Sequence, residues 1–293
     1  MKSIRKLYFQ NASGERFGLN GENGAYAKAL AGFGYSLSST FAGLGGGFYP
    51  AVKEDEDLQG ALAFSVVLTR TPYLSHRSFV DWLNGAGTLT IVYDPTGTQE
   101  YYRDVTVRFI EKGELNNVGW LELLCSFVCT TPWYLPVPAQ LQISGSAADA
   151  GKRYDYTYDE DLRYGPDSDS YMSATLADTG HIPGVLDVEL RGAIINPRLK
   201  LVGNRTGKVI GICSLPITLA ETDRLEYSSH YEDSYVRKVS SDGTVTDLLD
   251  VLDLSLTPFF RVPVNEPSTL SVEADAEFSG TAQLKVYYYF RSV

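Results

Sequence analysis

Apolar residues recur at every second position through much of the first part of the chain. In the run 61–70, Leu62, Phe64 and Val66 alternate with small or polar neighbours, which is the period of a strand with one buried face. Turn-forming residues at 94–97 and 116–117 separate successive runs. Further strands are predicted near 4–9 and at 35–41, 88–93, 101–111 and 120–129. The pattern predicts an antiparallel, all-β unit.

One segment of this first part has a helical period instead. Phe79, Trp82 and Leu83 follow the i, i+3, i+4 spacing of a helix face. Ser75 is placed to cap the start, and Gly85 is placed to end the helix. The sequence therefore predicts a single short helix of about ten residues.

Residues 139–183 differ in kind from what precedes and follows them. Small and polar residues dominate, and seven acidic residues lie between Asp149 and Asp169, interleaved with tyrosines. We interpret the segment as a linker or long excursion, part of which docks on another surface through its tyrosines. The predicted organisation is a unit at 1–138, this linker, and a second unit at 184–293.

The second unit again shows short, evenly spaced apolar runs. Val185, Asp187 and Glu189 alternate with Leu186, Val188 and Leu190. Other predicted strands lie at 194–202, 208–213, 225–228, 235–239, 259–264, 269–274 and 281–290. Strands at this spacing, with no helical period between them, predict an antiparallel sandwich or jelly roll.

Composition supports the prediction of an all-β protein and disfavours one class of binding partner. Twenty Tyr and thirteen Phe are abundant, and such side chains suit a pleated, half-buried surface. The net charge is −11, which disfavours a nucleic-acid partner because that polyanion must be neutralised by clustered cations. Up to Tyr134 the chain has 11 basic and 13 acidic residues, a net of −2, and the remainder has 14 and 23, a net of −9. The two parts are therefore expected to face different surroundings.

The first residues, the lack of long apolar stretches and the cysteines indicate the cellular compartment in which the protein is made. The start of the chain has no apolar core of signal-peptide length, and no stretch approaches the roughly 18 apolar residues of a membrane span. We expect a protein made in the cytosol, with no membrane partner. Cys125 and Cys129 would lie roughly 13 Å apart on one strand face, too far to bridge. Reduced, buried thiols are the prediction for all three cysteines.

Candidate binding motifs are weak. The glycines at 43, 45, 46 and 47 are followed by Phe48-Tyr49-Pro50 rather than by a Gly-Lys-Ser/Thr helix start. A loop at 43–50 and a solvated turn at 53–57 are predicted there. His76, His181 and His230 are scattered, without a metal-binding spacing, and Asp167 and Asp169 lack the ordered spacing of a calcium loop. No cofactor and no metal are expected.

Catalytic motifs are weaker still. A glycosidase needs two carboxylates, one desolvated so that its pKa rises. The acid clusters, Glu54 with Asp57 and Asp159 with Glu160 and Asp161, lie in the most polar stretches, where a solvated face is the better interpretation. No nucleophile elbow is present. We expect no enzyme and no catalytic residue, and keep glycan cleavage only as a hypothesis that rests on these acids.

Several features of the first part of the chain follow one another in a defined order. They are Tyr8-Phe9, Gly43 to Gly47, the strand from Gly60 to Leu68, the helix with Phe79, Trp82 and Leu83, the strand from Tyr101 to Val107, and the closing motif with Cys129, Pro132, Trp133 and Tyr134. This order resembles that of the distal tail protein family of long-tailed phages. The closing motif is the most specific, and the others carry weight by their order. The chain resembles this family over most of its length, and the motif residues are expected to be structural.

The second unit resembles the family's galectin-like β-sandwich. The matching pieces include Asn196-Pro197, Asp242-Gly243 and the run 259–263. The resemblance implies an all-β protein with a barrel-like or sandwich-like ring domain before that sandwich. It also implies a structural component of the virion tail tip, assembled in the host cytoplasm.

The resemblance further implies partners. They are other copies of the chain in a hexameric ring, the tail tube protein and the tail-tip hub protein. The alternative is a carbohydrate-binding adhesin module that contacts the host cell wall. Sugar sites commonly stack a sugar on Trp, and Trp82, Trp120 and Trp133 all lie in the first unit. That distribution weighs against the alternative.

Overall fold

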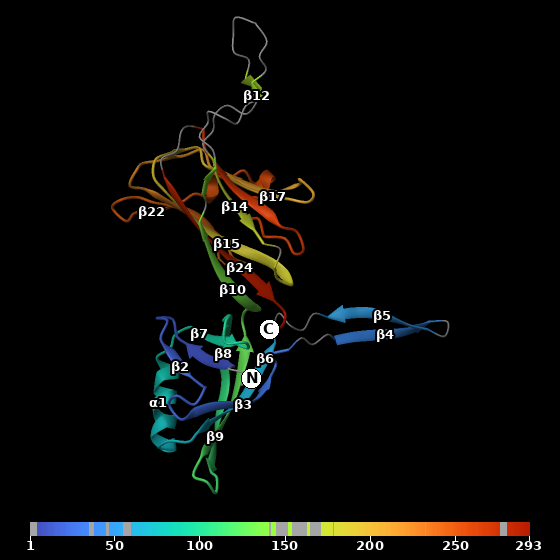
Figure 1. Ribbon diagram of the computed structural model, residues 1–293, viewed down its shortest axis with the longest axis vertical. Coiled ribbons are helices and arrows are strands. Elements are labelled where there is room, and N and C mark those ends of the chain that lie inside the picture. The colour runs from blue at the N-terminus through green and yellow to red at the C-terminus, as the bar shows by residue number, and fades with distance from the viewer. Residues whose placement is uncertain are drawn as a thin grey trace, which may run out of the picture. The chain divides into compact units, whose positions relative to one another are not determined.

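The computed structural model describes the backbone of residues 5–34, 38–44, 47–54, 60–140, 142–144, 152–153, 163–164, 171–177, 179–231, 233–275 and 280–293 (Figure 1). The chain divides into two compact units. Unit 1 comprises Met1–Leu135 with Tyr289–Val293, and unit 2 comprises Pro136–Tyr288. Strands dominate both, and the described part has one α-helix. The prediction of an all-β protein with one helix is confirmed.

Unit 1 holds the helix, the first nine strands and the start of the tenth, which continues into unit 2. Their bounds are β1 Lys6–Gln10, β2 Arg16–Gly18, β3 Ala25–Ala31, β4 Ser38–Leu44, β5 Gly47–Glu54, β6 Ala61–Leu68, α1 Pro72–Asn84, β7 Leu89–Asp94, β8 Tyr101–Leu115, β9 Leu121–Cys129 and β10 Trp133–Gln140. One set of strands runs in the order β2-β1-β7-β8-β10, and another in the order β3-β6-β9-β8. The long strand β8 belongs to both sets. Within the described strands this order is open, so the sandwich-like alternative describes unit 1 better than a closed barrel.

An aromatic cluster forms the core of unit 1. The Phe9 ring centroid lies 5.8 Å from that of Phe64 and 5.4 Å from that of Phe127. Phe79 joins from α1, at 5.7 Å from Phe9, and Trp133 is fully buried against Phe33. These side chains come from β1, β6, β9, β10 and α1, so the alternation in the sequence converges on one core.

The helix is longer at its start than the sequence predicted. It begins at Pro72, with Thr71 as N-cap, and ends at Asn84 with Gly85 as C-cap. Ser75 is therefore not the cap; its hydroxyl donates to the Arg70 carbonyl at 2.7 Å. Proline has the backbone angle of a first helical residue already set and loses no hydrogen bond there. The end at Gly85 is as predicted.

The glycine-rich segment differs from the prediction. Strands β4 and β5 pair antiparallel, with Gly43 opposite Phe48 and Ser38 opposite Glu54. Of the loop predicted at 43–50, residues 43–44 and 47–50 are strand, and of the turn predicted at 53–57, residues 53–54 are strand. Antiparallel pairing of their neighbours holds Gly43 and Gly47 in the ladder, although glycine has low strand propensity alone. Residues 45–46 and 55–59 lie outside the described residues.

Unit 2 contains the remaining strands. Their bounds are β11 Gln142–Ser144, β12 Lys152–Arg153, β13 Arg163–Tyr164, β14 Tyr171–Leu176, β15 Ile182–Arg191, β16 Ile194–Ile195, β17 Arg198–Gly203, β18 Val209–Ser214, β19 Thr218–Leu219, β20 Arg224–Ser229, β21 Ser234–Val239, β22 Val245–Asp247, β23 Ser268–Glu273 and β24 Thr281–Phe290, with 3₁₀ turns η2 Leu249–Val251 and η3 Leu254–Leu256. One sheet has the order β10-β24-β15-β20-β21-β22, and the other β11-β14-β23-β17-β18. The predicted sandwich is observed as these two sandwich-like sheets.

Alternate residues of both sheets form the core of unit 2. Val188, Leu225 and Tyr227 are buried on the first sheet, and Leu199 and Leu270 on the second. The Tyr227 hydroxyl donates to the Pro258 carbonyl at 3.1 Å and accepts from the Phe260 amide at 3.2 Å. A buried hydroxyl with both contacts fixes the segment that precedes Phe260.

Part of the segment interpreted as a linker is strand. Tyr171 to Leu176 pair with Glu273 to Ser268, and Gln142 to Ser144 pair with β14. In the acidic, tyrosine-rich stretch, the structure describes only the short β12–β13 pairing. The rest of that stretch, including Asp159, Glu160, Asp161, Asp167 and Asp169, lies outside the described residues.

Candidate assembly interface

The β3-β6-β9-β8 sheet of unit 1 has an apolar inner face in the core and an outer face that mixes large apolar side chains with polar ones. Leu62, Phe64 and Val66 of β6 and the alternate residues of β9 point into the core and are almost fully buried. The intervening residues form what we call the outer sheet face. Register places Val128 beside Ala61, Ser126 beside Ala63 and Leu124 beside Ser65. An antiparallel sheet with one wet face normally carries polar residues there, so this face is unusual.

Large apolar side chains on the outer sheet face are exposed. Tyr26 of β3, Phe109 of β8, and Leu124 and Val128 of β9 are each between 43% and 46% exposed. Ser65 and Ser126 lie between them, and Thr106 and Glu111 of β8 stand opposite Val128 and Leu124. Large apolar side chains exposed together on one face of a folded unit are typical of a contact with another protein.

One ion pair crosses this face. Lys28 Nζ lies 2.6 Å from Glu122 Oε2, and the hydrogen bond from Lys28 holds the pKa of Glu122 below its usual value. Both side chains are about half exposed. The outer sheet face is therefore apolar only in part, because it also carries this pair and Glu111 of β8, which stands opposite Leu124.

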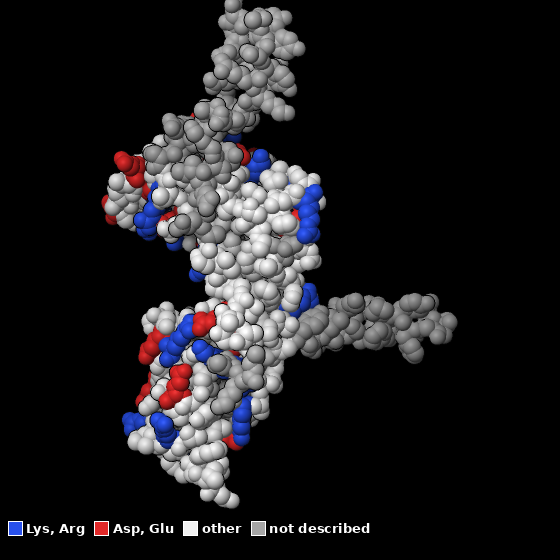
Figure 2. Space-filling view, viewed as in Figure 1, with Lys and Arg blue, Asp and Glu red and all other residues white. Residues whose placement is uncertain are grey.

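The turn between β8 and β9 presents a second apolar surface, which we call the hairpin tip. It consists of Leu115, Val118 and Trp120, exposed by 41%, 67% and 45%. In the view of Figure 2 the extreme end of unit 1 is white, without a charged side chain on the side that faces the viewer. Exposed Trp in a formed loop is the side chain most enriched among energetic hot spots of protein interfaces.

The hairpin tip is held in shape by Asn116. Its Oδ1 accepts hydrogen bonds from the amides of Val118 at 3.1 Å and Trp120 at 2.9 Å. The backbone closes the same turn, with the Gly119 amide donating to the Asn116 carbonyl at 2.9 Å. Gly119 has φ +76°, which favours glycine. A fixed loop loses little conformational entropy on binding.

The edge of β8 beyond Val105 is also open. Strand β7 pairs with β8 only from Tyr101 to Val105. Among the described strands, the rest of β8 pairs with β9 alone. The unpaired backbone groups of such an edge are able to add a strand from another chain.

The motif residues lie in or against the core of unit 1. Phe79, Cys129 and Trp133 are buried, and Trp82 and Leu83 pack against the same cluster. Their placement accords with a role in folding, because none reaches the outer sheet face or the hairpin tip.

The closing motif is tied to β8. The Tyr134 hydroxyl donates to Asp104 Oδ1 at 3.1 Å, and its ring stacks on Tyr102. On either side of Pro132, Arg103 of β8 contacts the motif. Its Nε donates to the Thr131 carbonyl at 3.0 Å, and its guanidinium lies over the Trp133 ring. These contacts fasten the end of unit 1 to the strand that carries the hairpin tip.

The cysteines are free and buried, as predicted. Burial raises the pKa of Cys125 and of Cys213 to about 12, so neither thiol is a nucleophile at neutral pH. Burial also raises the pKa of Cys129.

The histidines are separated from one another. His76 lies on α1, where burial and then Lys112 lower its pKa. His230 follows β20, with Nε2 3.4 Å from Asp187 Oδ1. In the described part of the chain, no three His, Cys, Asp or Glu side chains form a group able to hold a metal. No helix of the described residues is long and apolar enough to cross a membrane.

The hairpin tip and the outer sheet face were not predicted from the sequence. A partial signal was present in the run Trp120 to Cys129, whose outward set has Leu124 and Val128, although Glu122 and Ser126 stand beside them. A strand that is apolar on both sides is typically covered on both sides.

Comparison with protein families gives a match within unit 1. Residues 6–130 match the family described as the N-terminal domain of the distal tail protein. A comparison with curated proteins finds no match.

Solved structures share the fold over the whole chain. A chain of the phage P2 baseplate, in its activated conformation with calcium, is similar with a TM-score of 0.63 and 13% identity, covering 99% of this chain and 100% of that chain. The SPP1 Dit protein, described as a paradigm of the hub adsorption apparatus in phages that infect Gram-positive bacteria, is similar with a TM-score of 0.55 and 11% identity. That match covers 96% of this chain and 98% of that chain.

Proposed function

We propose that this protein is a structural part of a phage tail tip and that its copies form a hexameric ring there. The match of unit 1 to the N-terminal domain of the distal tail protein family supports this role. The ring would join the tail tube protein on one side to the tail-tip hub protein on the other. The chain would be assembled in the host cytoplasm and would act in the virion. No catalytic step is part of this function.

The observation that carries the proposal is the outer sheet face together with the hairpin tip. Both are apolar and exposed in the single chain, and both lie on unit 1. A ring requires a contact in which one patch meets a different patch on the next copy, so that rotation closes the assembly. An open β8 edge and two apolar surfaces provide such different patches.

The charge distribution supports the same function. The part up to Tyr134 is almost neutral, with a net of −2, whereas the remainder has a net of −9. Faces buried between protein rings lose contact with water, and charged residues are depleted at the centres of such interfaces. The acidic remainder is suited to a solvated position.

The direct test is the mass of the purified chain by light scattering, together with negative-stain images. A six-fold ring, alone or with the tube and hub proteins, is the expected result. A chain that stays monomeric at high concentration and binds neither the tube protein nor the hub protein would contradict the proposal.

A variant of the hairpin tip tests whether this surface takes part in the contact between copies of the chain. Val118→Asp is expected to abolish assembly while leaving the folded monomer intact, because Val118 is 67% exposed and supports no core contact. The matched control is Leu254→Asp in unit 2, where the leucine is 74% exposed. Loss of the ring in both variants would mean that the tip has no special part in assembly.

A further inference from the structure

Residues 245–256 of unit 2, which we call the leucine–aspartate segment, run from the edge of one sheet to the edge of the other. The segment begins in β22, the last strand of the first sheet. It continues through η2 and then η3, which lies against β18, the last strand of the second sheet. Leu248 and Leu252 are buried and anchor the segment to the unit.

The other aliphatic side chains of the leucine–aspartate segment are exposed. Leu254 is the most exposed large apolar side chain of the described residues. Large apolar side chains exposed together on a folded unit are typical of a contact with another molecule. The set, each member of which is at least 36% exposed, consists of Val245, Leu249, Val251, Leu254 and Leu256.

Carboxylates alternate with these aliphatic side chains. Asp247, Asp250 and Asp253 are all exposed. Asp247 Oδ1 accepts from the Leu249 amide at 2.9 Å, and Asp253 Oδ1 accepts from the Ser255 amide at 3.0 Å. The hydrogen bonds from Ser255 hold the pKa of Asp253 below its usual value, so this group is ionised at neutral pH. The segment is therefore both aliphatic and negatively charged.

The basic side chains of the neighbouring strand β21 are already paired. Arg237 stands opposite Asp247 in the β21–β22 register, but its Nε lies 2.6 Å from Glu226 Oε2. Lys238 Nζ lies 2.7 Å from Asp223 Oδ2. Within the residues that the structure describes, no ion pair therefore neutralises the charge of the leucine–aspartate segment.

The leucine–aspartate segment has a fixed shape. The Leu248 amide donates to the Val236 carbonyl at 2.9 Å, which continues the pairing with β21. At the other end the backbone comes close to β18, because a Cβ at Gly211 would lie 2.7 Å from the Thr257 carbonyl oxygen. A surface that is formed before binding loses little conformational entropy when a partner covers it.

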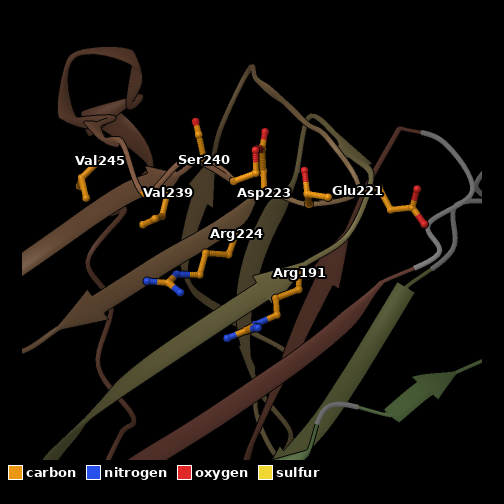
Figure 3. A pocket seen from close by; sticks show the side chains of 10 residues that line it. Arg191, Glu221, Asp223, Arg224, Val239, Ser240 and Val245 are labelled. Carbon is orange, nitrogen blue, oxygen red and sulfur yellow. The ribbon is translucent and has the colours of Figure 1, made fainter.

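A hollow of about 500 Å³ adjoins the segment through Val245, which lines both. Figure 3 shows Val245 and Glu221 at opposite ends of this hollow. Glu221 takes part in no ion pair within the described part of the chain. Arg191 and Arg224, which also line the hollow, are paired with glutamates of the same sheet. The hollow therefore adds a recess and one more free carboxylate beside the segment.

From these features we infer that the leucine–aspartate segment is a docking site for a basic, aliphatic segment of a different protein. Leucine or valine side chains of such a partner would cover the exposed aliphatic side chains and remove their apolar area from water. Its Lys or Arg side chains would meet the carboxylates, which gives the contact its specificity. The site lies on unit 2 and goes beyond the proposed ring, whose contacts lie on unit 1.

The charge of the leucine–aspartate segment selects this partner over the alternatives. A second copy of the chain presents the same segment, so a two-fold contact would bring like charges together. Nucleic acids and anionic lipid surfaces are repelled for the same reason. An aliphatic surface without cations would bury the carboxylates unpaired, which is costly.

The test is the binding of two synthetic peptides to the full chain, measured by fluorescence anisotropy of a label on the peptide. Both peptides are amphipathic and of equal length, with leucine at the same positions. One has lysine at the remaining positions and the other has glutamate. The Leu/Lys peptide is expected to bind, and to bind more weakly as salt is added, because salt screens the charges. The Leu/Glu peptide is expected not to bind.

Two variants place the binding on the segment. Leu254→Ser should weaken binding of the Leu/Lys peptide about tenfold. Asp250→Asn should weaken it roughly threefold, as expected for an exposed charge pair. The matched controls are Ile195→Ser, since this isoleucine of unit 2 is 43% exposed, and Glu114→Gln in unit 1, which removes the same charge. Both controls should bind as the unaltered chain does, and thermal melting checks that all four variants fold.

Five outcomes would overturn the inference. The first three are no binding of the Leu/Lys peptide, equal binding of the two peptides, and equal weakening by the variants and their controls. Binding to phosphatidylcholine vesicles that Leu254→Ser abolishes would make a membrane the occupant. Self-association in sedimentation velocity that Leu254→Ser abolishes would make a second copy the occupant. Leu254→Ser should leave the ring of the proposed function intact, so the two proposals fail separately.

Discussion

The outward sheet faces of the two units are built alike and carry opposite chemistry. On the outer sheet face of unit 1, Phe109, Leu124 and Val128 stand exposed, with Lys28 and Glu122 paired among them. On the outward face of the β15-β20-β21 sheet of unit 2, Glu226 and Arg237 stand at the corresponding positions. Both are antiparallel sheets with one face in a core.

This difference shows that the outward residues of a sheet indicate whether another protein or water will cover that face. Apolar outward residues are stable only where another protein covers them, because each leaves apolar area in water. Outward ion pairs hold their hydration and are costly to bury. The first face is suited to assembly, and the second to water and polar ligands.

The largest expected effect separates the two faces of β9. Phe127→Ala, on the core side, should lower the free energy of unfolding of unit 1 by about 3–5 kcal/mol, because Phe127 is fully buried between Phe9 and Phe64. Val128→Ala, on the outward side, should cost less than about 1 kcal/mol. Urea unfolding followed by Trp fluorescence measures unit 1 alone, since all three Trp lie there. Equal losses would mean that the outward side is already covered within the chain.

The next effect concerns assembly. Val128→Lys should raise the dissociation constant of the proposed ring about tenfold or more, because the ammonium group would be buried without a partner. Val209→Lys in unit 2 is the matched control, since both valines are 43% exposed. Sedimentation velocity over a concentration series measures the shift. A similar shift in both variants would remove the distinction between the two units.

A pH effect should belong to unit 2. Burial alone would raise the pKa of Asp187, but His230, Ser228 and Tyr287 outweigh it, and the pKa lies below its usual value. The stability that Asp187 contributes is therefore present above the unfolded pKa of about 3.9 and is lost as the pH falls through the folded pKa. Asp187→Asn should flatten this acid dependence in melting curves followed by tyrosine circular dichroism. An unchanged pH profile would show that Asp187 makes no such contribution.

The smallest effect is expected at the ion pair of unit 1. Glu122→Gln should change the free energy of unfolding of the monomer by less than about 1 kcal/mol, because exposed pairs are screened by water. Denaturant unfolding below the assembly concentration measures this. A much larger loss would mean that the pair is part of the fold rather than of an exposed surface.

Local patterns allowed a good prediction of the elements. Alternation placed the strands around Phe64 and Val188, and the spacing of Phe79, Trp82 and Leu83 placed the helix. The errors were also local in origin. The helix begins earlier than predicted because Pro72 fits the first turn, and Gly43 and Gly47 lie in paired strands because their neighbours pair.

The sequence by itself determined the fold class, the single helix and the buried state of the cysteines, because each depends on the order of apolar and polar residues along a short stretch. The tertiary structure decided which outward sheet faces are exposed and which charged side chains pair. Glu226 faces Arg237 through the register of β20 and β21, and Val118 and Trp120 are presented together by Asn116. A period of two places residues on opposite sides of a strand, but only the packed chain determines which side is covered.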